Sequence, residues 1–380
     1  MKILIAPGVF KHSLGASAVA EAIARGLARS GLDANCDMLP IADGGNGTLD
    51  AFLAQGGKRV RVTVRDPLGR EIEAAYGLID DGHTAVIEMA LASGLELVGA
   101  DNLDPLSTTT YGTGQLLQAA LEAGARRFIV GMGGSATVDG GAGAVQALGV
   151  RLLDTNGNAI PDGGGGLAQV ATVDASGLDP HWQETEVIIA SDVDNPTLGE
   201  RGAAAIFGPQ KGASPADVDV LEANLRHYFT VIADQVGVDV RSVTGGGAAG
   251  ALSAGLMAFI GGRIESGIDL ILNHNRFVER LEEADLVITG EGRIDEQTIY
   301  GKGPIGVARL AREHGVPTVA IVGGLEADDA LLHEAGIQAV LPVVTGPMAL
   351  DEALARADEL VERAALRLGY VLQVGMRCRE

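Results

Sequence analysis

Short apolar runs alternate with amphipathic stretches at both ends of the chain, a pattern that predicts strands followed by helices. At the N-terminal end we expect strands at residues 2–6 and 34–40, and helices at 16–30 and from about Thr48. In the last third we expect strands at 285–289, 318–322 and 339–343, and helices at 306–314, 328–335 and 350–368. Apolar strands that alternate with helices are typical of a parallel sheet with right-handed crossovers.

The middle of the chain has a different pattern. Polar and apolar residues alternate in RVRVTV, and DPLGRE and DDGH have turn composition, so residues 58–89 predict antiparallel hairpins. Glycine-rich and helix-forming segments continue to about Gly267. The fold class that we predict is α/β, with a Rossmann-like parallel-sheet domain, residues 1–60 and 268–380, interrupted by an inserted α/β domain with a mixed sheet, residues 61–267. The active site is expected in the cleft between them.

Composition narrows the class of protein. A length of 380 residues exceeds what one core usually supports, which favours two domains. The 50 acidic residues outnumber 28 basic ones, and a formal charge of -22 argues against nucleic acid or anionic membranes as partners. Two isolated cysteines and no run of 18 apolar residues predict a cytoplasmic, soluble protein.

The first two loops carry candidate chemistry at strand ends. PGVFKHSLGA places Lys11 and Ser13 between a strand and a helix, where Ser13 is expected to cap the helix and nearby N–H groups can bind an anion. In ADGGNGT, Asp43 precedes two glycines after the second strand. A carboxylate there could accept a proton or bind Mg²⁺, although Asp before Gly is also ordinary turn chemistry.

A glycine-rich loop, GMGGSATVDGGAG, follows an apolar strand and leads into a helix. Its exposed amides at Gly133 and Gly134, with the Ser135 and Thr137 hydroxyls, predict a phosphate-binding loop, and Asp139 adds a candidate metal ligand. The alternative is a tight strand-to-helix turn without a ligand.

Two later segments add charged groups. In SDVDNP, Asp192 and Asp194 alternate by two at a strand end and therefore point the same way, as paired metal ligands do; a polar rim would look the same. FGPQKGA supplies Lys211, and DLVITGEGRIDEQTIYGKGP gathers Glu291, Arg293, Asp295 and Lys302 after a buried strand. An acidic protein that binds an anion needs such local cations.

Other common motifs are missing. GGGAAG at Gly245 to Gly250 formally fits a dinucleotide fingerprint, but no clean strand precedes it, so close packing of small residues is the expected role. The sequence has no Walker A motif, no nucleophile elbow and no histidine spacing suited to zinc.

Together these segments resemble the glycerate kinase type I family over nearly the whole chain. ADGGNGT is similar to its DGGEGT, GGSATVDGG to its GGSATNDGG, and SDVDNP with GAAAIFGPQKGA to its counterpart. ITGEGRID followed by GK resembles its C-terminal signature, and TTTYGTGQL and VIEMALASGLELV also resemble family stretches.

The resemblance implies transfer of the γ-phosphoryl of ATP to a hydroxyl of D-glycerate with Mg²⁺, giving 2-phospho-D-glycerate. It implies Lys11 and Arg293 for the substrate carboxylate or the transferred phosphoryl, Asp192 and Asp194 for Mg²⁺, and Asp43 or Asp295 as base. The substrate- and phosphate-binding set is completed by Ser13, Gly133, Gly134, Ser135, Thr137, Lys211, Glu291 and Lys302.

The chain departs from the family pattern near this site. Gly8, Val9 and His12 stand where the family's PDSFKGS has Asp, Ser and Gly, and Asn46 replaces the Glu of DGGEGT. The loss of two carboxylates lowers the negative charge around the substrate, which suits another small hydroxy acid as well as D-glycerate. The alternatives are therefore such a kinase, a kinase that forms 3-phosphoglycerate, or a non-catalytic relative. The chain is also compatible with a homodimer.

Overall fold

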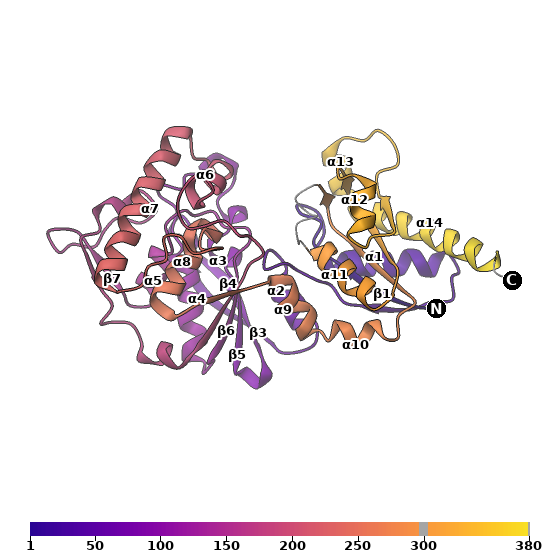
Figure 1. Ribbon diagram of the computed structural model, residues 1–380, viewed down its shortest axis with the longest axis horizontal. Helices are drawn as coiled ribbons and strands as arrows, with labels where there is room; N and C mark the ends of the chain where they lie inside the picture. The colour runs from indigo at the N-terminus through magenta and orange to yellow at the C-terminus, as the bar shows by residue number, and fades with distance from the viewer. Residues whose placement is uncertain (296–302, 379–380) are drawn as a thin grey trace. The chain divides into compact units, whose positions relative to one another are not determined.

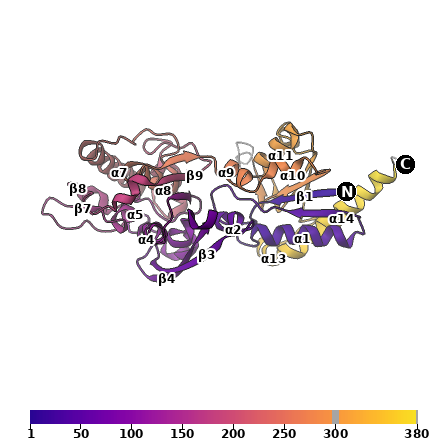
Figure 2. The same cartoon turned by 90° about the horizontal axis from the view of Figure 1, so that it is seen from below.

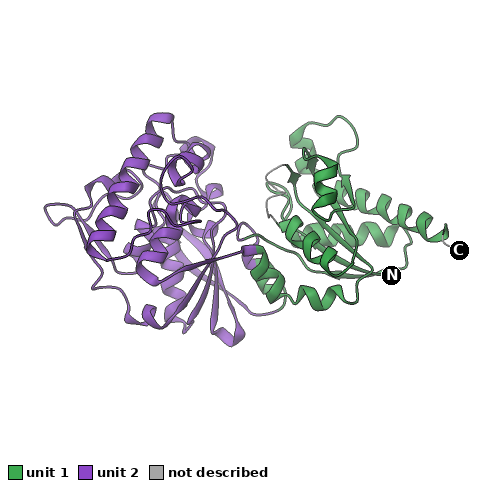
Figure 3. Ribbon diagram, in the orientation of Figure 1, with its two compact units in different colours: residues 1–43, 50–55, 268–380 green, residues 44–49, 56–267 purple. Residues whose placement is uncertain are grey.

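The computed structural model describes residues 1–295 and 303–378 of the chain. Their contacts form two compact units, coloured separately in Figure 3. Unit 1 contains residues 1–43, 50–55 and 268–380, and unit 2 contains residues 44–49 and 56–267.

Unit 1 is built on a parallel sheet with the strand order β15-β13-β11-β1-β2. Its strands are β1 (Lys2–Pro7), β2 (Asn35–Met38), β11 (Leu286–Gly290), β13 (Thr318–Val322) and β15 (Ala339–Pro342). The central strands are almost wholly apolar and buried, as the pattern predicted, and Ile3 of β1 lies opposite Leu286 of β11.

Helices cover this sheet, and α14 packs along α1 in Figures 1 and 2. The helices are α1 (Ala16–Arg29), α2 (Thr48–Leu53), α9 (Gly267–His274), α10 (Phe277–Leu281), α11 (Gly303–Glu313), α12 (Asp329–Glu334), α13 (Leu350–Ala355) and α14 (Ala357–Arg377). The single helix predicted at 350–368 is wrong, because the backbone leaves helical geometry at Arg356 and the second helix continues to Arg377.

Unit 2 contains a mixed sheet with the order β10-β9-β6-β5-β4-β3. The strands are β3 (Lys58–Arg65), β4 (Glu71–Ile79), β5 (Thr84–Glu88), β6 (Arg127–Gly131), β9 (Glu186–Ala190) and β10 (Arg263–Glu265). β3, β4 and β5 pair antiparallel, as RVRVTV and its turns predicted, whereas β5, β6, β9 and β10 run parallel. The predicted α/β fold class, with one parallel and one mixed sheet, is thus confirmed.

The remaining elements of unit 2 are helices and a small hairpin. They are α3 (Ala90–Ser93), α4 (Tyr111–Glu122), α5 (Ala142–Ala147), α6 (Ala203–Phe207), α7 (Pro215–Gln235), α8 (Ala248–Ile260), and the antiparallel pair β7 (Arg151–Leu153) and β8 (Thr172–Asp174). The chain's one tryptophan, Trp182, is buried in this core against Phe128 of β6, with ring centroids 4.9 Å apart.

None of the helices within residues 1–295 and 303–378 is both long and apolar enough to span a bilayer.

Candidate functional site

Loop segments of unit 2 meet at the carboxyl ends of its parallel strands β6 and β9. β6 ends at Gly131 and β9 at Ala190, and the glycine-rich loop, residues 131–143, hereafter the cradle loop, leaves from the first of these. The ADGGNGT segment joins it, because the Gly133 N–H donates to the Gly44 carbonyl at 2.9 Å. Ligands of α/β sheets bind at this edge.

Glu88, at the end of β5, explains why the ADGGNGT segment lies there. Its carboxylate is 5% exposed and accepts the N–H groups of Gly47 at 3.1 Å and Leu49 at 3.0 Å. These bonds satisfy donors at the start of α2 that the helix itself leaves unpaired. Gly44 has φ +86°, and a Cβ there would overlap the Ala190 carbonyl, so only glycine fits between the loops.

The cradle loop presents two consecutive amide donors. Gly134 is exposed with φ +80°, and no acceptor for the Gly134 and Ser135 N–H groups is found in residues 1–295 and 303–378. A Cβ at Gly134 would lie 2.5 Å from Asn46 Oδ1, and Asn46 Nδ2 donates to Glu96 at 3.1 Å. Successive unpaired amides next to a left-handed residue are the usual geometry of an anion-binding turn.

Asp139 anchors this loop from inside the fold. It is fully buried, and its carboxylate accepts bonds from Thr110 N and Oγ1, both at 2.8 Å, from Gly141 N at 3.0 Å and from Gly143 N at 3.2 Å. Burial raises the pKa of the Asp139 carboxyl, and these four hydrogen bonds oppose that shift. The residue is therefore an internal anchor and not the metal ligand that the sequence suggested.

Lys211 lies beneath the same loop. Its side chain is buried, and the ammonium donates to Ser135 Oγ at 2.6 Å and to the Thr137 carbonyl at 2.7 Å. Burial lowers the pKa of Lys211 to about 7, against the opposing effect of the Asp139 charge. The structure thus brings together Ser135, Thr137 and Lys211 of the predicted phosphate-binding set, with Lys211 on the inner side.

GGGAAG packs against the cradle loop, as expected of small residues in close contact. The Gly140 N–H donates to the Gly250 carbonyl at 3.0 Å, and Ala249, Gly250 and Ala251 all have positive φ at the start of α8. Left-handed backbone at two alanines is costly, about 1–2 kcal/mol per residue, and signals a turn imposed by its surroundings.

The two predicted metal ligands lie on the loop after β9. Asp192 Oδ1 accepts the Gly267 N–H at 3.0 Å, while the Asp194 side chain is 71% exposed and pairs with Arg201 at 2.9 Å. No group of three or more His, Cys, Asp or Glu side chains that could hold a metal is found in the described part of the chain. Mg²⁺ often uses one or two carboxylates with substrate phosphates, so the assignment of Asp192 and Asp194 stays a prediction.

Most of the predicted residues of unit 1 lie on two adjacent loops, which follow β1 and β11. β1 and β11 are parallel neighbours, and the Gly8 N–H donates to the Gly290 carbonyl at 2.8 Å, so the loops that follow are side by side. A Cβ at Gly292 would lie 3.2 Å from the backbone nitrogen of Lys11. Lys11 is exposed and Glu291 is half-buried. Their predicted roles stay predictions.

Arg293 lies on a short strand, β12 (Arg293–Ile294), which pairs with β14 (Gly324–Leu325). Its guanidinium forms an exposed ion pair with Glu326. Because both side chains are exposed, the pair is worth little and Arg293 remains available to an anion. Asp295 is half-buried in this loop, Asp43 is half-buried after β2, and Lys302 lies outside the described residues.

The predicted cap at Ser13 is wrong. α1 begins at Ala16 with Gly15 as its N-cap, and no side chain caps it. The Ser13 hydroxyl instead donates to the Phe10 carbonyl at 3.0 Å and closes the loop on itself.

Sequence reasoning missed the residues that support the cradle loop. Thr108 Oγ1 donates to the Ala136 carbonyl at 2.9 Å, and Thr110 binds Asp139. Three consecutive threonines before a helix, in TTTYGTGQL, were the one local signal, since buried hydroxyls need partners. Nothing local pointed to Glu88 or Glu326 as partners.

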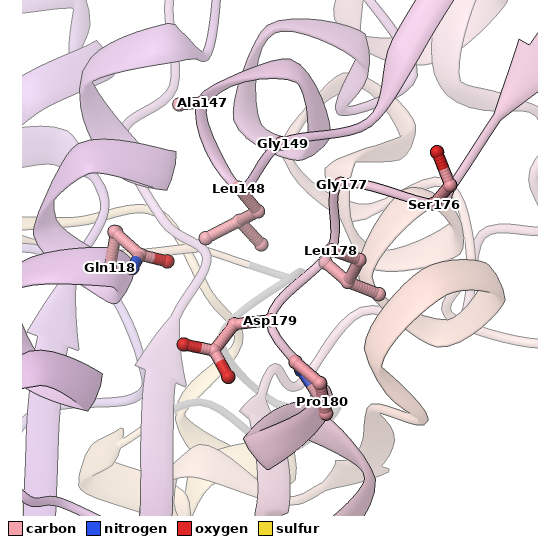
Figure 4. A pocket seen from close by; sticks show the side chains of 9 residues that line it. All are labelled: Gln118, Ala147, Leu148, Gly149, Ser176, Gly177, Leu178, Asp179 and Pro180. Carbon is pink, nitrogen blue, oxygen red and sulfur yellow. The ribbon is translucent and has the colours of Figure 1, made fainter.

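Unit 2 also has a surface hollow of about 520 Å³, shown in Figure 4. It is lined by Gln118, by residues 147–149 and by residues 176–180, and it includes none of the predicted site residues. It is therefore separate from the carboxyl edge of the sheet.

Comparison with known proteins agrees with the motifs. A model of the glycerate kinase family matches residues 3–373. The chain is 49% identical to a glycerate 2-kinase of Escherichia coli K12, with 99% of each chain covered, and 49% identical to a glycerate kinase of Halalkalibacterium halodurans, with 97% of each covered. A crystal structure from Salmonella typhimurium LT2 that carries the name glycerate kinase 2 superposes with a TM-score of 0.85 at 46% identity over 99% of both chains. Whole-length matches at this identity show that the chain belongs to the glycerate kinase family.

Proposed function

We propose that the chain phosphorylates D-glycerate with ATP and Mg²⁺ and forms 2-phospho-D-glycerate. The main support is the cradle loop, where the Gly134 and Ser135 amides have no acceptor among the described residues. Relatives named glycerate 2-kinase and glycerate kinase, each 49% identical to the chain, favour D-glycerate as the acceptor. We also place the protein in the cytoplasm, since Cys36 and Cys378 are both free thiols.

The residues present fit a nucleotide and Mg²⁺. Two amide donors and the Ser135 hydroxyl suit phosphate oxygens, and the carboxylates of Asp192 and Asp194 suit a hard cation. When bound, Mg²⁺ would neutralise phosphate charge. Phosphoryl transfer needs positioning and charge stabilisation more than covalent chemistry, which is what these groups supply.

The remaining roles fall to unit 1. We assign Lys11 and Arg293 to the substrate carboxylate or the transferred phosphoryl, because both are exposed cations on neighbouring loops. Asp43 or Asp295 would accept the proton of the reacting hydroxyl, and both carboxylates are half-buried. Ser13 and Glu291 complete this set, with Ser13 acting through its loop.

A second candidate is a kinase of another small hydroxy acid. Asn46 lies against Gly134, so a residue that departs from the family motif touches the cradle loop itself. That contact is the observation that favours an acceptor other than D-glycerate.

The test is a coupled assay for ADP with Mg²⁺-ATP and a panel of small hydroxy acids, with the product identified by phosphorus NMR. We expect turnover on D-glycerate and a 2-phosphate signal. A matched pair of variants, Asp43→Asn and Asp295→Asn, identifies the base, because only the base should cost 10²-fold or more in kcat. Turnover confined to another acid would favour the second candidate, and no turnover with intact ADP binding would refute both.

A further inference from the structure

The backbone around Lys211 fixes the direction of its side chain. It ends a 3₁₀ turn, Pro209–Lys211, in which the Lys211 N–H donates to the Gly208 carbonyl at 2.9 Å. Gly212 follows with φ +99°, and a Cβ there would overlap the Leu103 carbonyl. The side chain, 1% exposed, is therefore directed inward by a turn that has little freedom.

The buried ammonium is expensive unless it has partners. Moving such an ion out of water costs several kcal/mol, and an apolar side chain of similar size would avoid that cost. Two of the three Lys211 donors are satisfied, by Ser135 Oγ and the Thr137 carbonyl. No ion pair to Lys211 is found among the described residues, so its charge is not cancelled at contact distance.

The first partner, Ser135, is 5% exposed and directly follows the exposed Gly134 of the cradle loop. Ser135 Oγ accepts from Lys211, and no other hydrogen bond of this hydroxyl is found within the described ranges. Its own proton is therefore left to donate elsewhere. The unpaired N–H groups of Gly134 and Ser135 lie on the same turn as this hydroxyl. The cradle loop thus carries three donors, and the Lys211 ammonium lies beneath them.

We infer that Lys211 is a positioning residue of the cradle loop, which orients the Ser135 hydroxyl toward a phosphate and places a positive charge under it. This inference rests on the proposed function, since it takes the bound anion to be a nucleotide phosphate. It also changes the predicted role of Lys211, which acts through Ser135 and does not itself contact the ligand.

The charge of Lys211 is set by few groups. Asp139 of the cradle loop is the charged side chain that acts on it, and Tyr228 of α7 faces Asp139 with its own pKa raised by burial, so Tyr228 stays neutral. With a pKa of about 7, Lys211 loses its proton as the pH rises above neutrality. Phosphate affinity should then fall in the same range.

The test compares binding of inorganic tripolyphosphate and ADP by calorimetry in four proteins: wild type, Lys211→Met, Ser135→Ala and the double variant. Lys58→Met, an exposed lysine at the start of β3, is the matched control for lost charge. We expect Lys211→Met to weaken tripolyphosphate about 10-fold or more, and the double variant to equal it, because Lys211 acts through Ser135. Lys58→Met should stay within twofold. Trp182 fluorescence verifies folding in each.

A pH series separates positioning from simple packing. Between pH 6.5 and 8.5, wild-type affinity should fall relative to that of Lys211→Met, whose affinity follows only the ligand's own titration. Equal pH profiles, or additive losses in the double variant, would overturn the inference. Tripolyphosphate binding that depends on Lys211 without turnover on D-glycerate would refute the proposed function alone, whereas turnover unaffected by Lys211→Met would refute the inference alone.

Discussion

Asp139→Asn is the sharpest perturbation of the cradle loop. Oδ2 of Asp139 accepts three hydrogen bonds, two from Thr110 and one from Gly143, and Oδ1 accepts one from Gly141. The side-chain oxygen of an asparagine would best replace Oδ2, where it keeps three of the bonds. Its NH₂ group would then replace Oδ1 and face the Gly141 N–H, so that two donors oppose each other. One buried bond is lost and one buried N–H is left unpaired.

The magnitude follows from this count. A hydrogen bond to a charged group is worth about 1.5–3 kcal/mol, and an unpaired buried donor costs about 1–3 kcal/mol. Removal of the buried charge relieves part of the desolvation cost that raises the pKa of Asp139, which offsets the weakening of the other three bonds. We expect the free energy of unfolding of unit 2 to fall by about 2–4 kcal/mol.

Urea unfolding followed by Trp182 fluorescence measures this change, because the chain's one tryptophan is buried in unit 2 and reports on that unit alone. At an m-value of about 3 kcal/mol/M, the midpoint should drop by roughly 1 M. Asp101→Asn, on an exposed turn, is the control and should shift it little. An equal midpoint for both variants would show that Asp139 does not anchor the loop as an ionised acceptor.

Three further predictions concern single positions. Asn46→Glu would set a carboxylate beside Glu96, to which Asn46 now donates a hydrogen bond, and the two like charges should repel each other. We expect the KM for ATP in steady-state assays to rise about tenfold. The additional substitution Glu96→Gln should restore most of the lost affinity. His12 has φ +65°, so His12→Val should destabilise unit 1 by about 1 kcal/mol or more in circular-dichroism melts while His12→Gly should not; equal melts would refute this. A Cβ at Gly26 would overlap the backbone of α14, so Gly26→Ala should cost unit 1 about 1–3 kcal/mol without moving the tryptophan signal, whereas Gly375→Ala, with open space around it, should be neutral or stabilising.

The alternation of apolar strands and helices was enough to predict the parallel sheet of unit 1, because a strand that is buried on both faces is apolar throughout. β1, β11 and β13 lie where apolar runs placed them. Helix ends were less predictable. Ser13 has the composition of a cap, but the helix starts three residues later, and the break at Arg356 has no glycine or proline to announce it.

The sequence offers candidate ligand-binding residues more readily than it shows which residues of the site contact each other. Glycines and hydroxyls of the cradle loop could be found from composition, since few other residues make such a turn. That Lys211 lies beneath Ser135, 76 positions away in the sequence, depends on how α6 and its turn pack, which no local pattern encodes. For the same reason the sequence could not show that Glu88 holds the ADGGNGT segment.

The cradle loop and the loop after β1 are held in place by different kinds of contact. The cradle loop is tied by buried bonds to Asp139 and Lys211, so a change there disturbs several partners at once. The loop after β1 carries its charge on exposed Lys11, and a Cβ at Gly8 would meet only ordinary contact, 3.5 Å from the Gly290 carbonyl. Substitution is therefore sterically cheap at Gly8, whereas His12 holds a left-handed backbone and Asn46 contacts Gly134 of the cradle loop. We therefore expect the loop after β1, which we assign to the acceptor, to tolerate substitution better than the buried part of the cradle loop, where one change disturbs several hydrogen bonds.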